Sequence, residues 1–213
     1  MTAKIALAEP FEAVALPKAA ITVSVAHTLD DLMQAMAIRS VVYMGEQLCP
    51  YDEEFDGNDL AGATHLIARI GSQPVGVIRL RWFCDFAKLE RLTVLPNCRG
   101  GAVPRALLDA AFELAAKKGY RKIMGHTQVR LAPVLMRLGK VKVRAGRAKF
   151  KFSDHEYVET IRELTPPADA VTIDSDPLMI LRPEGAWDRP GVLDRSTLRA
   201  ATNPHAKSAP PPC

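Results

Sequence analysis

The chain has 213 residues, of which 48% are hydrophobic, and a formal net charge of +4. That length and apolar content suit one globular domain, and the mild positive charge fits an anionic ligand but is too small to indicate nucleic acid. The four cysteines show no metal-binding spacing and no stretch approaches the ~20 apolar residues of a membrane span, so we expect no metal, no membrane span and a cytoplasmic location.

The two ends of the chain differ in composition from its middle. Residues 1–20 are rich in alanine and contain two prolines, so we interpret them as an N-terminal extension. Residues 195–213 combine Ala, Pro, Ser and Lys without an apolar stripe, which predicts a disordered tail. We therefore expect one folded domain at residues 21–194.

The domain is expected to begin with a strand, a long helix and a hairpin. Alternating apolar and polar residues predict a strand at 21–25. Thr28 suits a helix N-cap, and apolar residues then recur at helical spacing to about residue 43. Two further strands are predicted at 65–70 and 75–82, joined by a turn that contains Gly and Pro.

Charged residues gather around an acidic loop at 50–62, between the helix and the hairpin. The carboxylates Glu46, Glu53, Glu54, Asp56 and Asp59 have two readings. Single carboxylates in such a loop are most often only solvated, and Arg39 on the helix would be a surface charge or a carboxylate partner. Beside an acceptor site, the same group would attract an amine substrate.

The stretch 89–119 has the pattern of a phosphate-binding turn. An apolar run at 89–95 predicts a strand, and a small basic loop with two glycines follows at 99–102. Apolar residues spaced by three and four from Val103 then predict a helix that ends at Gly119. Loop amides and a helix N-terminus together attract an anion, although the same pattern also occurs in an ordinary tight turn.

The remaining elements are shorter. We expect a strand at 122–126, a short helix at 129–138 and a strand or short helix at 157–164. Apolar residues at 171–173 and 178–181 suggest a last strand.

Residues 140–151 alternate basic and apolar side chains. The simpler reading is a strand with one solvated, charged face. The functional reading is a basic wall that recruits an anion, either a phosphate of a cofactor or an acidic substrate.

Two segments resemble the GNAT superfamily of acyl-CoA N-acyltransferases. The 89–119 stretch resembles its coenzyme A-binding motif, and the segment 39–66 resembles the bacterial ElaA-like branch. The residues that match the ElaA-like pattern are Arg39, Val42, Glu46, Gln47, Cys49, Pro50, Tyr51, Asp56, Gly57, Asp59, His65 and Leu66. Residues 54–56 and 75–80 also resemble acyl-homoserine-lactone synthases. The resemblance implies an α/β fold with a mixed, mostly antiparallel central sheet flanked by helices.

The resemblance also implies a binding mode for acetyl-CoA or another acyl-CoA. Leu92, Thr93 and Val94 would pair through their backbone with the pantetheine arm, as an edge strand accepts an extended peptide. The loop with two glycines would hold the pyrophosphate through Arg99, Gly100, Gly101, Ala102 and Val103. Gln128 matches a further position of the ElaA-like pattern.

The sequence departs from the family pattern at two informative places. Pro104 stands where a small residue with a backbone donor is usual, and proline has no N–H. Leu135 stands where many members have a tyrosine that protonates the departing thiolate. Proton donation must then come from water or another side chain, or catalysis is lost.

The base that deprotonates the amine is expected on the central strand. Glu90 is the first candidate because strand alternation places it on the same face as Leu92 and Val94. His126, at the end of the next strand, is the second candidate, and His155 is a more distant third. A backbone N–H of the central strand would stabilise the oxyanion.

These features predict an N-acyltransferase that moves an acyl group, acetyl or longer, from acyl-CoA to a small-molecule or peptide amine. Arg39, Glu46, Glu54 and Asp56 would contact that acceptor. The alternative is a degenerate member that binds acyl-CoA or a protein partner without turnover. A homodimer is left open, and no nucleic acid partner is expected.

Overall fold

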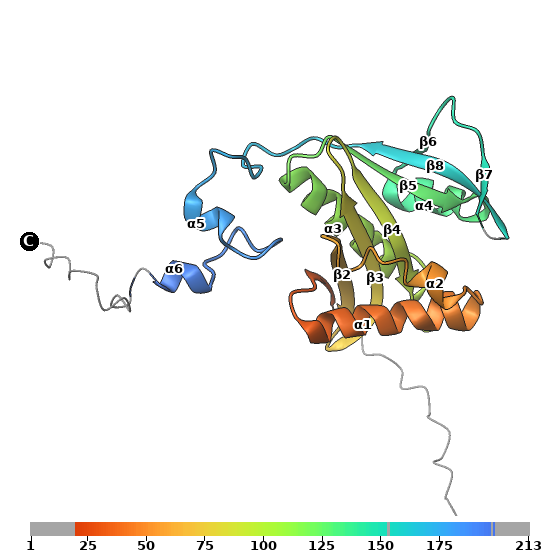
Figure 1. The fold of residues 1–213 in the computed structure, drawn as a ribbon, viewed down its shortest axis with the longest axis horizontal. Helices are drawn as coiled ribbons and strands as arrows, with labels where there is room; N and C mark the ends of the chain where they lie inside the picture. Colours follow the sequence, from red (N-terminus) through yellow and green to blue (C-terminus); the bar gives the residue numbers. More distant parts are fainter. Residues whose placement is uncertain (1–19, 153, 197, 199–213) are drawn as a thin grey trace, which may run out of the picture.

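The computed structural model describes residues 20–152, 154–196 and 198. The expectations for an N-terminal extension and for nearly all of the tail therefore lie outside the described residues. An eight-stranded sheet dominates the fold, with the order β1-β2-β3-β4-β5-β8-β6 and with β7 paired to β8 (Figure 1). All strand pairs are antiparallel except β4 with β5, so the mixed, mostly antiparallel sheet expected from the sequence is confirmed.

The strands are β1 Ile21–Val25, β2 Thr64–Ile70, β3 Gln73–Trp82, β4 Ala87–Val94, β5 Lys122–Gln128, β6 Lys142–Val143, β7 Phe150–Phe152 and β8 His155–Glu163. The helices are α1 Leu29–Arg39, η1 Ser40–Glu46, α2 Tyr51–Glu54, η2 Pro96–Cys98, α3 Ala102–Lys117, η3 Val129–Leu131, α4 Ala132–Gly139, α5 Pro177–Ile180 and α6 Val192–Ser196.

Helices cover both faces of the sheet, and β3 shows why. Alternate side chains of a strand point to opposite faces. Ile78 belongs to the main core, which α3 builds with residues such as Leu107. Val77, its neighbour, packs instead with Ala35 and Ile38 of α1. This double coverage explains why every residue of β3 from Val75 to Leu80 is buried, whichever face its side chain points to.

The helix α1 begins with a capping box, as Thr28 suggested. The Thr28 hydroxyl accepts a hydrogen bond of 3.1 Å from the Asp31 backbone N–H, and the Asp31 carboxylate accepts one of 3.1 Å from the Thr28 N–H. The helix continues into the π-helical segment η1, so the helical stretch extends past residue 43 to Glu46.

The strands β4 and β5 separate partway along their length. They pair only where Ala87–Leu89 lies beside Ile123–Gly125, and beyond this point the edge of β4 that faces β5 has no partner strand. The parting of these two strands opens the centre of the sheet.

A bulge in β4 makes the expectation about Glu90 wrong. Arg79 pairs with Glu90 but Val77 pairs with Thr93, so β4 carries one extra residue, and Arg91 has a positive φ of 53°. Leu92 and Val94 consequently pack toward the main core with α3, whereas Glu90 contacts Arg79 on the α1 side. Simple alternation fails here because the inserted residue moves every later side chain of β4 to the opposite face of the sheet.

Two other expectations are corrected in the last third of the chain. Residues 171–173 and 178–181 form no strand. Asp176 caps the short helix α5 by accepting hydrogen bonds from the N–H groups of Leu178 and Met179, and Pro177 occupies its first turn. The basic segment 140–151 is not one strand either, because β6 and β7 are separate short strands that both pair with β8.

Residues 183–187 fold back onto the domain. The Glu184 carboxylate accepts hydrogen bonds from Lys118 at 2.8 Å and from Thr64 at 3.0 Å, and Trp187 packs against the main core. In the part of the chain that the structure describes, no helix is both long enough and apolar enough to cross a membrane.

Candidate active site

A cleft of about 670 Å³ lies where β4 and β5 part. One side carries the ends of these strands and α2, and the other side carries apolar residues of α3 and α4. Its lining includes Tyr43, Asp52, Glu53, Asp56, Lys88, Leu89, Glu90, Arg91, Leu92, Pro104, Leu108, Phe112, His126, Gln128, Leu135, Phe150, Phe152 and Tyr157. Both candidate bases from the sequence, Glu90 and His126, therefore line one cleft.

Glu90 is held by cations on both of its carboxylate oxygens. Lys88 approaches one oxygen at 2.6 Å, and Arg79 donates to the other from two nitrogens at 2.7 and 3.0 Å. Burial raises the pKa of Glu90, but the hydrogen bond and charge of Lys88, together with the charge of Arg79, outweigh it and hold the pKa below its usual range. Glu90 is therefore a stable carboxylate and a weak base.

His126 is better suited than Glu90 to accept a proton at neutral pH. Its ring makes an edge contact with Phe150, at 5.0 Å between ring centres. Partial burial, followed by the nearby charge of Lys88, lowers the pKa of His126 despite the opposing effect of Glu159 and Glu90. The imidazole is therefore neutral near pH 7 and keeps a lone pair for a proton.

The glycine loop lies at the N-terminus of α3 with the geometry of an anion site. Gly100 and Gly101 have φ angles of 126° and 123°, which residues with a side chain rarely adopt. No side chain caps this helix, and among the described residues the N–H groups from Gly100 to Val103 make no close hydrogen bond. These free donors and the helix dipole fit a pyrophosphate group.

Comparison with known proteins agrees with this geometry. The model of the acetyltransferase (GNAT) family matches residues 30–135. A protein of Bacillus subtilis (strain 168) that carries the name of an acetyltransferase is 32% identical over 111 residues, which are 51% of this chain and 76% of that relative. The chain belongs to the GNAT family.

Solved structures show the same fold. Escherichia coli ElaA superposes with a TM-score of 0.59 at 20% identity, over 68% of this chain and 100% of ElaA. An acyl-CoA N-acyltransferase from Pseudomonas aeruginosa superposes with a TM-score of 0.59 at 23% identity, over 67% of this chain and 99% of that one. The resemblance to the GNAT family is thereby confirmed, and the likeness to ElaA is confirmed at the level of the fold.

A buried ion-pair network lies behind the cleft. Arg39 binds Glu54 and Asp59, and Arg79 binds Asp59, Asp56 and Glu90. Arg39, Glu54 and Arg79 have no exposed surface. The network therefore joins α1, the acidic loop, β3 and β4 into one rigid unit behind the cleft.

The network changes the interpretation of three residues expected to touch substrate. Arg39 and Glu54 are fully buried and do not line the cleft, so in this structure they contact side chains rather than a ligand. Asp56 does line the cleft, but Arg79 and Arg91 hold its carboxylate. Sequence alone hid this because the arginine that neutralises the loop lies on a distant strand.

Glu46, the fourth residue expected to contact the acceptor, lies beside the glycine loop instead. Its carboxylate accepts two hydrogen bonds from Arg99, at 2.7 and 3.0 Å, and Arg99 also donates to the Val94 carbonyl at 3.0 Å. Neither side chain lines the cleft. The pair fixes the end of β4 relative to η1, next to the glycines.

Hydroxyl groups remain in the cleft although Leu135 lacks one. Leu135 lines the cleft from α4, as its sequence position suggested. Tyr157, which the sequence reading did not single out, lines it from β8 and accepts a 3.3 Å hydrogen bond from the Gln128 amide. Tyr43 also lines it, and burial raises the pKa of Tyr43 to about 12. Nothing in the local pattern around Tyr157 distinguishes it from a sheet residue.

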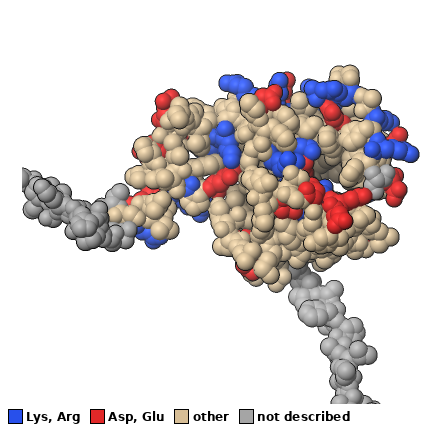
Figure 2. Space-filling model, viewed as in Figure 1, with Lys and Arg blue, Asp and Glu red and all other residues tan. Residues whose placement is uncertain are grey.

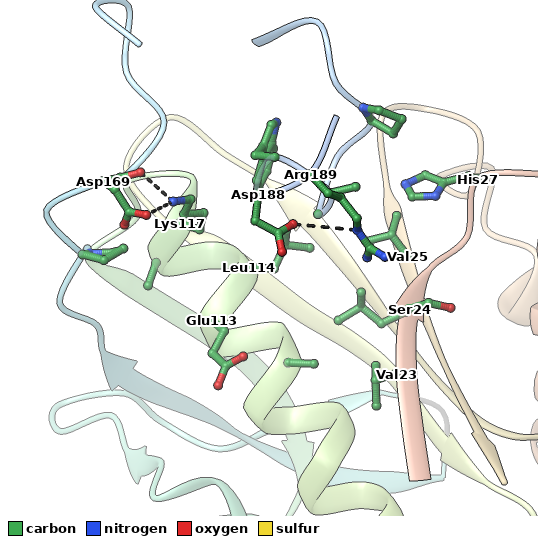
Figure 3. A pocket seen from close by; sticks show the side chains of 18 of the residues that line it. Val23, Ser24, Val25, His27, Glu113, Leu114, Lys117, Asp169, Asp188 and Arg189 are labelled. Carbon is green, nitrogen blue, oxygen red and sulfur yellow. Dashed lines mark hydrogen bonds and ion pairs between the residues drawn. The ribbon is translucent and has the colours of Figure 1, made fainter. Parts of the chain in front are cut away.

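A second cavity of about 850 Å³ lies between β1, α3 and residues 165–189 (Figure 3). Four of its charged side chains are paired, since Lys117 contacts Asp169 and Arg189 lies 3.9 Å from Asp188. Neither candidate base lines it. Among the described residues, no group of three or more His, Cys, Asp or Glu side chains is arranged to hold a metal ion. The cleft between β4 and β5 is therefore the candidate active site.

Proposed function

We propose that this GNAT protein transfers an acyl group, acetyl in the first instance, from acyl-CoA to the nitrogen of an amine. The observation that carries the proposal is the placement of the cleft, which runs along one strand. The C-terminal end of β4 leads into the glycine loop, which suits a pyrophosphate. The middle of β4 carries Glu90, which lines the same cleft as His126 of β5 where the two strands part.

Three parts of the chain would hold the acyl-CoA. The amides from Gly100 to Val103 would bind the pyrophosphate, and Arg99 would add a positive charge near it. The free edge of β4 at Leu92, Thr93 and Val94 would pair with the amide groups of the pantetheine arm. Gln128 lines the facing side of the cleft.

The reaction would proceed by direct attack. The amine nitrogen gives its lone pair to the thioester carbonyl carbon, and a backbone N–H of β4 stabilises the resulting oxyanion. His126 accepts the proton that the nitrogen releases, because its neutral imidazole is more basic than the ion-paired Glu90. The C–S bond then breaks, and the thiolate takes a proton from Tyr157 or from water.

The direct test is release of coenzyme A thiol from acetyl-CoA in the presence of a pool of amines, with the acylated product identified by mass spectrometry. Thiol release that depends on amine, with a mass increase of one acetyl group on that amine, supports the proposal. Binding of acetyl-CoA without any release would instead favour the non-catalytic alternative that Leu135 suggested.

Gly100→Asp is expected to weaken coenzyme A binding sharply. The structure leaves open space around an added Cβ at this position, so the loss comes from the positive φ and from a negative charge beside the pyrophosphate rather than from a clash. Calorimetric titration measures it. Gly71→Asp is the matched control, since Gly71 also has a positive φ and open space but lies in the β2–β3 turn. Equal affinities in the wild type and Gly100→Asp would contradict the assignment.

Tyr157→Phe is expected to lower the turnover number if its hydroxyl protonates the thiolate, while Leu135→Tyr is expected to raise it. The thiol of coenzyme A has an ordinary pKa near ~8.5, so unassisted release is tolerable and the loss in Tyr157→Phe should be partial. Steady-state kinetics of both variants and of the double variant measure this. If Leu135→Tyr restores the rate of Tyr157→Phe, the two hydroxyls serve one role; unchanged rates in all variants would assign the proton to water.

A further inference from the structure

We propose that the acceptor is a small aliphatic diamine, which reacts at one nitrogen and is held through a second, positively charged nitrogen. This inference rests on the proposed function and concerns only the acceptor side of the same cleft. Three features carry it: the net charge of the cleft lining, two carboxylates that form no ion pair with any described residue, and an aromatic wall.

The cleft lining is negative although the whole chain is positive. Its charged side chains comprise the four carboxylates of Asp52, Glu53, Asp56 and Glu90, but only two fixed cations, Lys88 and Arg91. The chain as a whole has a net charge of +4. A local excess of negative charge opposite in sign to the overall charge favours a cationic ligand at this place.

The two cations of the lining are already engaged. Lys88 contacts Glu90 at 2.6 Å, and Arg91 contacts the buried Glu54 at 3.0 Å and Asp56 at 3.3 Å. In contrast, Asp52 and Glu53 form no ion pair with any described residue. These two carboxylates on α2 are therefore the negative charges of the cleft that remain for a ligand.

Aromatic rings form the wall contributed by β7 and β8. Phe150 and Phe152 line the cleft with 36% and 49% of their surfaces exposed, and both contact the Tyr157 ring at 5.8 Å between centres. Adjacent exposed aromatic rings that line a cleft are typical of a ligand-binding groove. A ring face attracts an organic cation, and its carbon edge packs against methylene groups.

The basic residues of the same segment do not contribute to this wall. Lys151 alternates with the two phenylalanines along β7, and neither it nor Lys149 lines the cleft. Figure 2 shows basic side chains on the upper right part of the molecule, where Figure 1 places β6 to β8, with a band of acidic side chains below them. No lysine or arginine of segment 140–151 lines the cleft, so its interpretation as a basic wall for an acidic acceptor does not apply there.

A second nitrogen would keep the acceptor positively charged while its first nitrogen reacts. The attacking amine must be neutral, because an ammonium has no lone pair to give to the carbonyl carbon. A monoamine would therefore lose its attraction to the negative lining at the moment it reacts. A diamine keeps one positive charge for Asp52 and Glu53 while its other nitrogen attacks in the neutral form and then releases its proton to His126.

The test compares 1,4-diaminobutane with butylamine as acceptors at saturating acetyl-CoA. We expect kcat/KM to be about tenfold higher for the diamine, mainly through KM. The double variant Asp52→Asn/Glu53→Gln should remove most of this preference. Asp109→Asn, an exposed carboxylate on α3 outside the cleft, is the matched control and should leave the preference unchanged.

Other outcomes separate the two proposals. Equal kcat/KM for the two amines, a preference that survives the double variant, or a better acceptor among amino acids or lysine peptides would overturn the diamine inference. Absence of thiol release with every amine would count against the proposed function. In that case, calorimetric titration with both amines still tests the inference. Equal affinities for the diamine and for butylamine, or undetectable binding of the diamine, would overturn it.

Discussion

Replacement of His126 by glutamine is expected to lower the turnover number by about 10²–10⁴-fold, the usual contribution of a general base. Glutamine keeps the polarity of the site but cannot accept a proton at neutral pH. The side chain lies at the cleft surface rather than in the core, so folding should survive. Steady-state kinetics at saturating acetyl-CoA measure the loss, and circular dichroism checks the fold.

The pH profile of the wild type gives a second readout of the same assignment. Only neutral imidazole can act as base, and the local environment lowers the pKa of His126. The rate should therefore stay high as the pH falls past the ordinary histidine value of about 6.5 and decline only below it. This acid limb should disappear in His126→Gln.

Glu90→Gln is the control for the base assignment. Because Lys88 and Arg79 already neutralise Glu90, its replacement should reduce turnover less than His126→Gln does and should leave the acid limb in place. Unchanged turnover in His126→Gln, combined with a large loss in Glu90→Gln, would return the role of base to Glu90.

Arg39→Met is expected to destabilise the protein by about 3–5 kcal/mol. Methionine matches the length of the arginine stem but leaves the Glu54 and Asp59 carboxylates without one of their cations, and an uncompensated buried charge carries a cost of this size. Urea denaturation followed by tryptophan fluorescence measures the loss in the free energy of unfolding.

Two variants test the explanation for Arg39. Adding Glu54→Gln should recover part of the stability, because the uncompensated charge is then removed. Arg69→Met removes a partly exposed ion pair with Asp31 on the same side of the sheet and should cost only about 0–1 kcal/mol. A loss below about 1 kcal/mol in Arg39→Met would mean that water reaches the network.

Structural features that depend on local residue patterns could be predicted from the sequence. Features that depend on contacts between residues far apart in the chain could not. The helix α3 and its glycine loop were recognisable because apolar spacing and two glycines are local signals. The β4 bulge was not, because Arg91 has no residue type that announces a positive φ. That single inserted residue places Glu90 on the face of the sheet opposite to Leu92 and Val94.

The roles of the acidic loop and of Tyr157 were hidden for the same reason. The loop was recognisable as a family feature, but its carboxylates divide into structural and free ones only when Arg79 of β3 is placed among them. Tyr157 enters the cleft because β8 returns to pair with β5. Neither fact has a signature within the segment concerned.

The late strand β8 also determines where this protein can be shortened. Although the family match ends at residue 135, β8 lies beside β5 within the sheet, and β1 before residue 30 pairs with β2. A fragment cut to residues 30–135 would leave two backbone edges open to other chains, which promotes aggregation. A shortened form of the protein should therefore retain residues 20–163, and extending it past Trp187 would keep the apolar side of α3 covered.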